Sequence, residues 1–343
     1  MWLSGMQRPE FATINRFRSE YFKSSLASIF AKVVCYLLEH SYIKSEDYFL
    51  DGTKLEADAN KYSYVWRTNV TRYKQKVVRR AEEILAEIER INAEEEEIFE
   101  GKDLPEYGHG KPISSKEIAK IAESINEELK RKDIKKAKTE LKHISQKLDK
   151  YETQEKLLNG RNSYSKTDQD ATFMRLKNDE LRAAYNIQAA TENGFIVGYS
   201  VHQSANDATT FKEHLRQREQ LGLPAPARIT ADSIYGNEEN YEILQKKKIK
   251  SFLKYPTFRA ETRGKTSPFS YDAKRDQYTC LAGKKLSFAK NDTDVKKTGY
   301  VTSFKVYTCS SCRKCKFAAQ CGKRDAGPNR MLRFNKKLED FKL

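Results

Sequence analysis

The stretch that decides the fold is Tyr48-Phe-Leu-Asp-Gly-Thr-Lys-Leu-Glu-Ala-Asp-Ala-Asn60, in which a short apolar run ends at the carboxylate of Asp51. A second run of the same kind, Ile229-Thr-Ala-Asp232, ends at a carboxylate 181 residues further along the chain. Both runs predict strands, and open mixed sheets place their ligand-binding crevice at the carboxyl ends of strands. We therefore expect Asp51 and Asp232 to meet in the folded chain.

The residues after position 184 predict a mixed sheet with helices on its faces, an α/β (α+β) fold. Strands are expected over Tyr185–Thr191 and Phe195–His202, and the Asn-Gly pair between them is a strong hairpin signal. The further elements expected are a helix over about 209–221, a strand over Arg228–Asp232, a helix containing Glu238–Gln245 and a strand over Lys250–Tyr255. The strand that ends at Asp51 is the first strand of the same sheet.

A long helical hairpin is predicted as an insertion in that sheet domain, over residues 68–160. Its apolar side chains recur at steps of three and four residues, the pattern of a coiled-coil seam. They are Val77, Ala81, Ile84, Ile88 and Ile91 in the first arm and Ile134, Ala137, Leu141, Ile144, Leu148 and Tyr151 in the second. The breaker Gly101–Pro112 separates the arms, and Ser114-Ser-Lys-Glu117 has the form of a capping box. We interpret the hairpin as a spacer or dimerisation arm.

The N-terminal residues 1–42 predict helices. Their apolar face recurs at helical spacing and comprises Leu26, Ile29, Phe30, Val33 and Leu37. Arg16 and Arg18 precede this face and are candidates for contact with DNA. Part of a DNA-binding module and ordinary helix packing both account for the segment.

The composition favours a soluble protein with a nucleic-acid partner. The 343 residues include 64 Lys and Arg against 48 Asp and Glu, a formal net charge of +16, and neutralisation of phosphates supplies most non-specific affinity for DNA. A basic, solvated surface without a partner is the alternative. No run approaches the roughly 18–20 apolar residues that span a bilayer, and the N-terminus lacks the pattern of a signal peptide. A cytoplasmic location without membrane contact is expected.

Paired carboxylates from distant strands suit divalent-metal chemistry on a phosphodiester backbone. Mg²⁺ prefers oxygen ligands and takes one or two carboxylates together with substrate phosphates. Two such ions activate a water or a 3′-hydroxyl and stabilise the leaving oxygen. Asp51 and Asp232 are therefore predicted to be catalytic ligands of Mg²⁺ or Mn²⁺. Taken singly, each aspartate has the alternative role of a turn or capping carboxylate.

Five of the six cysteines fall in a short C-terminal stretch, which predicts a metal or redox site in a small β-rich module. They are Cys280 and then Cys309, Cys312, Cys315 and Cys321, with the spacing C-x2-C-x2-C-x5-C. Structural zinc takes four thiolate or imidazole ligands, so one cysteine is in excess. We favour Cys280 and Cys321 with two of the other three as Zn²⁺ ligands. An iron–sulfur cluster and unligated thiols are the alternatives.

Other candidate residues give weaker signals. Arg313 and Lys314, between the cysteines, suit phosphate contacts. Cys35 stands alone in an apolar stretch and predicts core packing. His202 and His214 receive no catalytic role, because lone histidines on strands and helices are usually structural.

Blocks of sequence in order along essentially the whole chain resemble bacterial insertion-sequence transposases of the DDE type. The blocks are Trp2–Phe11, Thr13–Arg18, Tyr48–Ala57, Ala59–Trp66, Asp170–Arg175, Tyr185–Gln188, Phe195–His202 and Ala231–Asn240. The resemblance implies an RNase H-like catalytic domain with its first acid at Asp51 and its second at Asp232. It also implies Mg²⁺-dependent cutting at element ends and joining to target DNA, with no covalent protein–DNA intermediate. Double-stranded DNA and a second copy or an intact transposase are the partners implied, in the nucleoid-associated cytoplasm.

With this resemblance, the expected domain organisation has four parts. Residues 1–42 form an N-terminal helical segment, 43–67 with 161–258 the catalytic domain, 68–160 the helical hairpin, and 259–343 the cysteine-rich module with the start of a C-terminal segment.

The third acid of the family is a glutamate on a helix beyond a block that resembles Arg333–Lys342, and the chain stops at Leu343. Glu339 is the nearest glutamate by position, but it falls within the preceding block. The family also carries a helical region before the block at Met1. We therefore expect an internal fragment of a transposase. The alternatives are an inactive DNA-binding or dimerising remnant, which acts as a regulator or has no function, and a non-transposing nuclease of the same fold.

Overall fold

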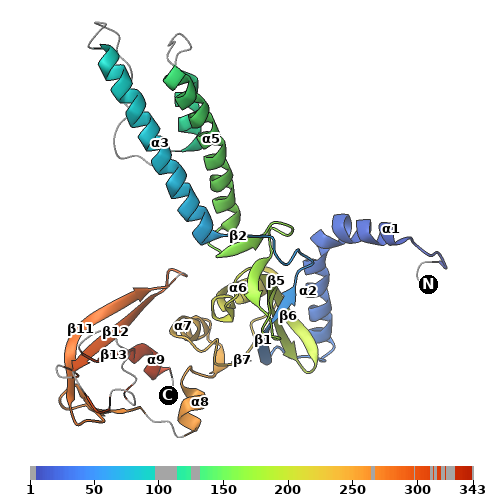
Figure 1. The fold of residues 1–343 in the computed structure, drawn as a ribbon. Coiled ribbons are helices and arrows are strands. Elements are labelled where there is room, and N and C mark those ends of the chain that lie inside the picture. Colours follow the sequence, from blue (N-terminus) through green and yellow to red (C-terminus); the bar gives the residue numbers. More distant parts are fainter. Residues whose placement is uncertain are drawn as a thin grey trace. The chain divides into compact units, whose positions relative to one another are not determined.

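The computed structural model describes residues 5–96, 114–124, 132–263, 267–296, 298–309, 312, 315–317, 321 and 329–341; within these, the side chains of 91–96, 124, 132–134 and 260 are not described. The chain divides into two compact units (Figure 1). Unit 1 comprises Met1–Thr53, Asn186–His202 and Asn206–Leu343, and unit 2 comprises Lys54–Tyr185 with Gln203–Ala205. Helices and sheets occur together, which confirms the expectation of an α+β class.

A six-stranded mixed sheet contains the strands predicted from the sequence. Its order is β4-β5-β1-β7-β8, with β6 also paired to β5. The strands are β1 (Asp47–Glu56), β4 (Thr172–Arg175), β5 (Leu181–Glu192), β6 (Phe195–His202), β7 (Arg228–Ala231) and β8 (Lys250–Leu253). β5 and β6 form the predicted hairpin, in which both Asn193 and Gly194 have positive φ angles. β1, β7 and β8 run parallel to one another.

Strand β1 buries one face and exposes the other, as the alternation of its side chains requires. Tyr48 and Leu50 are buried, whereas Phe49 and Asp51 are exposed. Helices α6 (Phe211–Gln220) and α7 (Glu238–Lys246) contribute Phe211, Leu215, Tyr241 and Leu244 to the same hydrophobic cluster. Burial of each such side chain contributes about 1.5–3 kcal/mol, so Tyr48 and Leu50 determine which face of β1 packs on the core. Asp51, at the next position in the alternation, then lies on the opposite face.

A buried carboxylate holds the segment that leads into β1. Glu192 accepts hydrogen bonds from the backbone N–H groups of Lys44 and Glu46, both at 3.1 Å, and of Ser45 at 3.0 Å. Three backbone donors satisfy this buried charge, which tethers the start of β1 to the end of β5.

The N-terminal residues form one continuous helical stretch, α1 (Phe11–Arg16), the π-helical segment η2 (Phe17–Phe22) and α2 (Lys23–Glu39). Of the five residues in the predicted apolar face, Phe30 and Leu37 pack against the core, whereas Leu26, Ile29 and Val33 are exposed. The buried face is rotated toward Phe30 and Val34, and the Phe30 ring meets Tyr199 of β6 edge-on with centroids 4.8 Å apart. Contact with the sheet, rather than the densest apolar stripe, decides which face packs.

By length and composition alone, the stretch Phe11–Glu39 is able to cross a membrane, and it is the one such helix in the described part of the chain. The expectation that no run approaches this apolarity is therefore wrong for this stretch, because Lys32 is the one charged residue between Lys23 and Glu39. Core helices meet the same criteria, and Phe30, Val34 and Leu37 of this stretch belong to or pack against the hydrophobic core.

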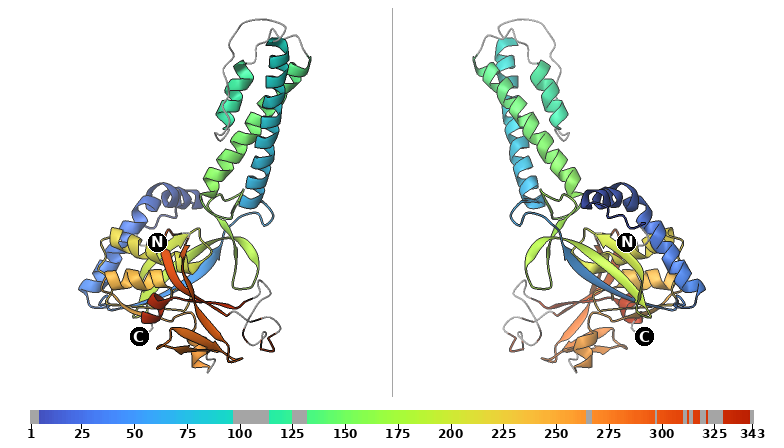
Figure 2. Two further views of the ribbon diagram at one scale, coloured as in Figure 1. Left: turned by 90° about the vertical axis from the view of Figure 1, so that its left-hand side faces the viewer. Right: turned by 90° about the vertical axis from the view of Figure 1, so that its right-hand side faces the viewer.

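The described residues of unit 2 form three helices, α3 (Arg67–Glu96), α4 (Ser115–Ser124) and α5 (Lys132–Leu158). α3 and α5 run side by side, as predicted for the two arms of the hairpin (Figures 1 and 2). The prediction that the apolar seam lies between two helices is wrong, because residues of a third helix, α4, are buried in the same cluster. Ala81 and Ile84 of α3 and Leu141, Ile144 and Leu148 of α5 are buried together with Ile118 and Ala122 of α4.

The local signals in this unit are confirmed where they are described. The Ser114 backbone N–H donates to Glu117 at 2.9 Å and the Glu117 N–H donates to the Ser114 hydroxyl at 3.3 Å, which is the predicted capping box. The breaker Gly101–Pro112 and the side chains of Ile91 and Ile134 lie outside the described residues. Short strands β2 (Tyr64–Trp66) and β3 (Ser163–Ser165) pair where α3 begins and α5 ends.

A five-stranded antiparallel sheet lies where a β-rich module is expected. Its order is β13-β12-β11-β10-β9. The strands are β9 (Phe269–Asp272), β10 (Gln277–Cys280), β11 (Lys285–Val295), β12 (Val301–Cys309) and β13 (Met331–Phe334), and the short helices α8 (Phe258–Thr262) and α9 (Lys336–Asp340) flank them. Just after α9, Phe341 stacks on Tyr241 of α7 with ring centroids 5.3 Å apart.

His214 ties helix α6 to the central sheet, in the structural role expected of it. Its Nε2 lies 2.7 Å from the Tyr48 hydroxyl of β1, and its Nδ1 lies 2.6 Å from the Ser200 hydroxyl of β6. Burial, with lesser contributions from the charges of His202 and Arg218, lowers the pKa of His214 to about 3. The ring is therefore neutral in the folded protein at neutral pH.

This lowered pKa makes stability depend on pH with a definite sign. In the unfolded chain His214 binds a proton near pH 6.5, whereas in the folded protein it stays neutral. The free energy of unfolding is therefore highest above pH 6.5 and falls as the pH is lowered toward 3. Between pH 6 and 4, the free energy of unfolding of His214→Gln should fall less steeply than that of the wild type, by about 1.4 kcal/mol per pH unit. Urea titrations at each pH measure this. His143→Gln, which replaces an exposed ring on α5, should keep the wild-type slope, and an equal slope for His214→Gln would contradict the assignment.

Candidate functional site

Asp51 and Asp232 lie side by side on neighbouring strands, Asp51 midway along β1 and Asp232 directly after the end of β7. The prediction that the first strand ends at Asp51 is wrong, because β1 continues to Glu56. β1 and β7 pair in parallel with Asp47 opposite Arg228, Tyr48 opposite Ile229 and Phe49 opposite Thr230. The same offset places Asp51 level with Asp232, one residue beyond the end of β7. Since neighbouring strands lie about 4.8 Å apart and level side chains share a face, the two exposed carboxylates face the same region of solvent.

The turn after Asp232 is shaped by its own carboxylate and by a close backbone contact. Asp232 Oδ1 accepts a hydrogen bond from the Ile234 N–H at 2.9 Å. A Cβ on Gly236 would lie 2.0 Å from the Lys254 carbonyl oxygen, so only glycine fits where this turn passes the chain after β8. The turn is thereby held against the sheet, and Asp232 with it.

A third carboxylate, Asp207, lies next to the backbone of the residue that follows Asp51 and was not predicted from the sequence. It begins the short 3₁₀ helix η3 (Asp207–Thr209) after β6. A Cβ on Gly52 would lie 3.0 Å from the Asp207 carboxyl carbon, 3.0 Å from the Tyr235 hydroxyl and 2.8 Å from Gln188 Nε2. These three side chains therefore pack directly against the backbone of the residue that follows Asp51.

Two buried amides on β5 hold Asp207 in place. Asn186 Nδ2 donates to Asp207 Oδ1 at 2.6 Å, and Gln188 Nε2 donates to the same oxygen at 3.3 Å and to Asn186 Oδ1 at 2.9 Å. The alternation of β5 puts both amides on one face, in a strand that also contains four alanines. Paired amides at positions i and i+2 are the sequence signal that indicates this buried polar network.

The Tyr235 hydroxyl lies within the electrostatic influence of all three carboxylates. Its hydroxyl donates to Gln188 Oε1, and the side chain is almost fully buried. Burial raises the pKa of Tyr235 well above its usual range, and the negative charges of Asp207, Asp51 and Asp232 raise it further. The hydroxyl therefore stays protonated and keeps its donor role next to a concentration of negative charge.

The chemistry of this donor set fits a hard divalent cation. Mg²⁺ takes one or two protein carboxylates and completes its shell with water and substrate phosphates, and Asp51 and Asp232 supply such a pair. In the described part of the chain, no group of three or more His, Cys, Asp or Glu side chains is arranged to hold a metal ion. The arrangement is that of a two-carboxylate site with Asp207 nearby, hydrogen-bonded to the amides.

The remaining predicted residues fall elsewhere. Glu339 on α9 is not among the charges that act on Tyr235; it is one of the charges that, after burial, raise the pKa of Tyr278 to about 12. Arg16 and Arg18 are exposed on the N-terminal helical stretch. Arg313 and Lys314 lie outside the described residues. The five clustered cysteines line one small cavity in the five-stranded module.

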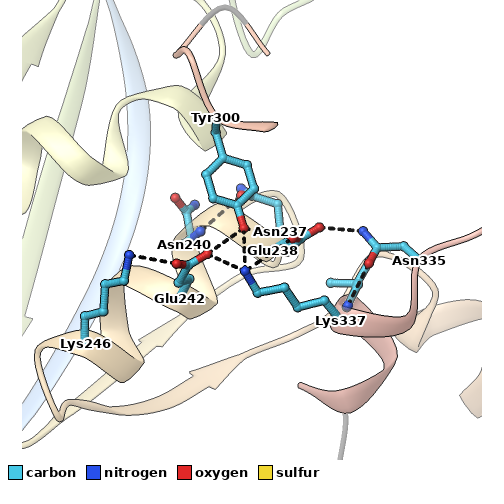
Figure 3. Close-up of polar contacts among 9 residues, drawn as sticks. Asn237, Glu238, Asn240, Glu242, Lys246, Tyr300, Asn335 and Lys337 are labelled. Carbon is cyan, nitrogen blue, oxygen red and sulfur yellow. Dashed lines mark hydrogen bonds and ion pairs between the residues drawn. The ribbon is translucent and has the colours of Figure 1, made fainter. Parts of the chain in front are cut away.

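The helix that follows Asp232 is fastened to this module by a network of hydrogen bonds and ion pairs (Figure 3). The Tyr300 hydroxyl, at the turn between β11 and β12, lies 2.8 Å from Glu238 Oε1 and 2.6 Å from Glu242 Oε2. Asn335 Nδ2 donates to Glu238 at 2.6 Å, and Lys337 Nζ donates to Glu242 at 2.7 Å. Lys246, Lys337 and Tyr300 together lower the pKa of Glu242 to about 2.

These contacts explain why two adjacent glutamates are buried at the start of α7. Glu238 and Glu239 are almost fully buried, and Thr298 donates to Glu239 Oε2 at 2.8 Å. A buried carboxylate is costly unless it is paired and hydrogen-bonded. The partners come from the module, so α7 and the module stabilise each other.

One comparison with known proteins identifies a domain family. A family model described as a transposase DDE domain matches residues 279–342. The matched stretch contains all five clustered cysteines and the Tyr300, Asn335 and Lys337 side chains that contact α7. The match supports a transposase of the DDE type, a class of DNA-binding proteins that generally use divalent metal ions. No curated protein and no solved structure matches the chain.

Loss of the Tyr300 hydroxyl should loosen the contact between the module and α7. Tyr300→Phe removes the single hydroxyl proton that lies within reach of two carboxylates, and a hydrogen bond to a charged group contributes about 1.5–3 kcal/mol to stability. We expect a fall of that size in the free energy of unfolding, measured by urea titration at pH 7. Tyr271→Phe is the matched control, because it removes a 2.7 Å bond to Asp276 at an exposed site of the same module. It should change stability by less than about 0.5 kcal/mol, and equal effects of the two variants would contradict the anchoring role.

Proposed function

We propose that this protein is a DDE-type transposase that cuts DNA at the ends of an insertion sequence and joins them to target DNA. The observation that carries the proposal is the register of β1 and β7, which brings Asp51, midway along β1, level with Asp232, directly after the end of the parallel strand β7. The match of residues 279–342 to a transposase DDE domain supports the same class of reaction.

An RNase H-like catalytic domain is part of this proposal. The strand order β6-β5-β1-β7-β8, with a hairpin on one side of β1 and parallel neighbours on the other, supports it. In this arrangement the first acid lies on the central strand and the second follows the neighbouring strand.

The roles of the residues follow from their positions. Asp51 and Asp232 would hold Mg²⁺ or Mn²⁺, which when bound supplies Lewis-acid activation of the attacking hydroxyl and stabilises the leaving oxygen. Asp207 adds a negative charge close to the pair, and the Asn186–Gln188 amides fix that charge. Tyr235 supports the site by hydrogen-bonding Gln188 and by filling the space against Gly52.

Double-stranded DNA is the proposed substrate. The net charge of +16 supports attraction to phosphates, and the exposed Arg16 and Arg18 are candidate contacts. A homo-oligomer, in the nucleoid-associated cytoplasm, is proposed as the working form.

Substitution of either paired aspartate should abolish cleavage without abolishing binding. Asp51→Asn and Asp232→Asn keep the side-chain size but remove a charged oxygen ligand, so we expect Mg²⁺-dependent nicking to fall more than about 100-fold, because even loss of an outer-shell partner costs 10–100-fold. The substrate is a supercoiled plasmid that carries the gene with its flanking DNA. Asp149→Asn, at an exposed position of α5, is the control and should cleave normally.

Gel-shift measurements in EDTA separate catalysis from binding. The two aspartate variants should bind the plasmid's flanking fragments as tightly as the wild type. Binding by the wild type without cleavage in either Mg²⁺ or Mn²⁺ would overturn the proposed activity and favour an inactive DNA-binding remnant. Cleavage without strand joining would favour a nuclease.

Replacement of Asp207 should have a smaller and different effect. Asp207→Asn removes a negative charge that is held near the pair but is not one of its two ligands, so the Mg²⁺ concentration for half-maximal nicking should rise about 10-fold. The rate at saturating Mg²⁺ should stay close to that of the wild type. A complete loss at saturating Mg²⁺, equal to that of Asp51→Asn, would show instead that Asp207 is itself a ligand.

A further inference from the structure

Five cysteines from separate parts of the C-terminal module line one small cavity. Cys280 ends β10, Cys309 ends β12, and Cys312, Cys315 and Cys321 follow in the connection toward β13. The cavity has a volume of about 20 Å³, which is close to the space that a single water-sized body requires. None of the cysteines is in a disulfide.

Packing separates four of these cysteines from the fifth. Cys309 and Cys312 are buried members of the module's hydrophobic cluster, and Cys280 and Cys321 pack against it. Cys315 lines the cavity but is not part of that cluster. The four cysteines in the cluster include a C-x2-C pair, which is a common element of structural zinc sites, and one cysteine from each side of that pair in sequence.

Backbone hydrogen bonds fix the position of Cys312 at the cavity. The Arg330 backbone N–H donates to its sulfur at 3.2 Å, and the Cys309 N–H donates to the Arg330 carbonyl at 3.0 Å. Arg330 also lines the cavity. Cys312 is thereby held next to the end of β12 and the residue before β13.

We propose that Cys280, Cys309, Cys312 and Cys321 bind one structural Zn²⁺, with Cys315 outside the ligand set. The ion fastens the ends of β10 and β12 to the connection that leads to β13. Among the described residues the thiols do not form a metal-holding group as they stand, so binding draws the four sulfurs together. Metal binding supplies free energy for such closure, because affinity and folding are coupled.

This proposal goes beyond the proposed DNA chemistry and is independent of it. The zinc is four-coordinate and closed, so it has no open position for a substrate. Its role is to hold the module whose Tyr300 and Asn335 contact α7.

The test measures metal in the full-length chain, purified without chelator after expression in zinc-supplemented medium. We expect one zinc per chain by inductively coupled plasma mass spectrometry. Cys280→Ser, Cys309→Ser, Cys312→Ser and Cys321→Ser should each bind zinc at least about 10-fold more weakly in competition with a chromogenic chelator. Cys315→Ser and Cys35→Ser should each retain one tightly bound zinc.

A second test uses the wild-type protein, so it remains valid if the cysteine variants fail to fold. Iodoacetamide should alkylate Cys315 in the native protein, whereas the four proposed ligands should react only after a chelator is added. Peptide mass spectrometry identifies the modified residues. Metal-free protein, a Cys315→Ser variant as weak as Cys312→Ser, alkylation of the four without chelator, or iron with inorganic sulfide in place of zinc would each overturn the proposal. Neither measurement uses DNA, so their outcome is distinct from that of the cleavage assay.

Discussion

The parallel register of β1 and β7 is the constraint on which the rest of the site depends. A shift of one residue would move Asp232 to the opposite face of the sheet. The first pair of the register is also an ion pair, in which Arg228 Nε donates to Asp47 Oδ1 at 2.7 Å and Nη2 donates to Oδ2 at 2.8 Å. Exposed pairs contribute little to stability, but a bidentate contact selects one alignment. Glu192 on one side and the glycine contact at Gly236 on the other fix the two ends of that alignment.

Two networks of polar side chains position the segments around this pair of strands. Buried amides on β5 hold Asp207 next to Gly52, and buried glutamates on α7 receive the side chains of the C-terminal module. In both places carboxylate oxygens accept hydrogen bonds from side chains of other segments, and at the start of α7 the carboxylates are also buried. Such networks are costly when incomplete, so the central sheet, α7 and the module depend on one another.

The sequence was informative where a pattern is local. Alternation and the Asn-Gly turn located β5, β6 and β7. Asp51 and Asp232 could be paired because each follows a short apolar run, although β1 continues past Asp51 to Glu56. Asp207 could not be found in this way, since its place is set by amides about 20 residues earlier in sequence. The face of α2 that packs, and the third helix in the seam of unit 2, were mispredicted for a related reason: periodicity shows which faces are apolar, but not which neighbour covers them.

The position of unit 2 within the chain has a consequence for the order of folding. The contacts of α3 with α5 lie largely within residues 54–185, so they become available during synthesis before β7 has left the ribosome. The pairing of β1 with β7 must wait for the later segment, and closing so long a loop is slow and entropically costly. Once residues 54–185 have folded, however, the effective loop is much shorter than the sequence separation of 181. We therefore expect the insertion to act as an internal scaffold that brings β1 and β7 within reach of each other during folding.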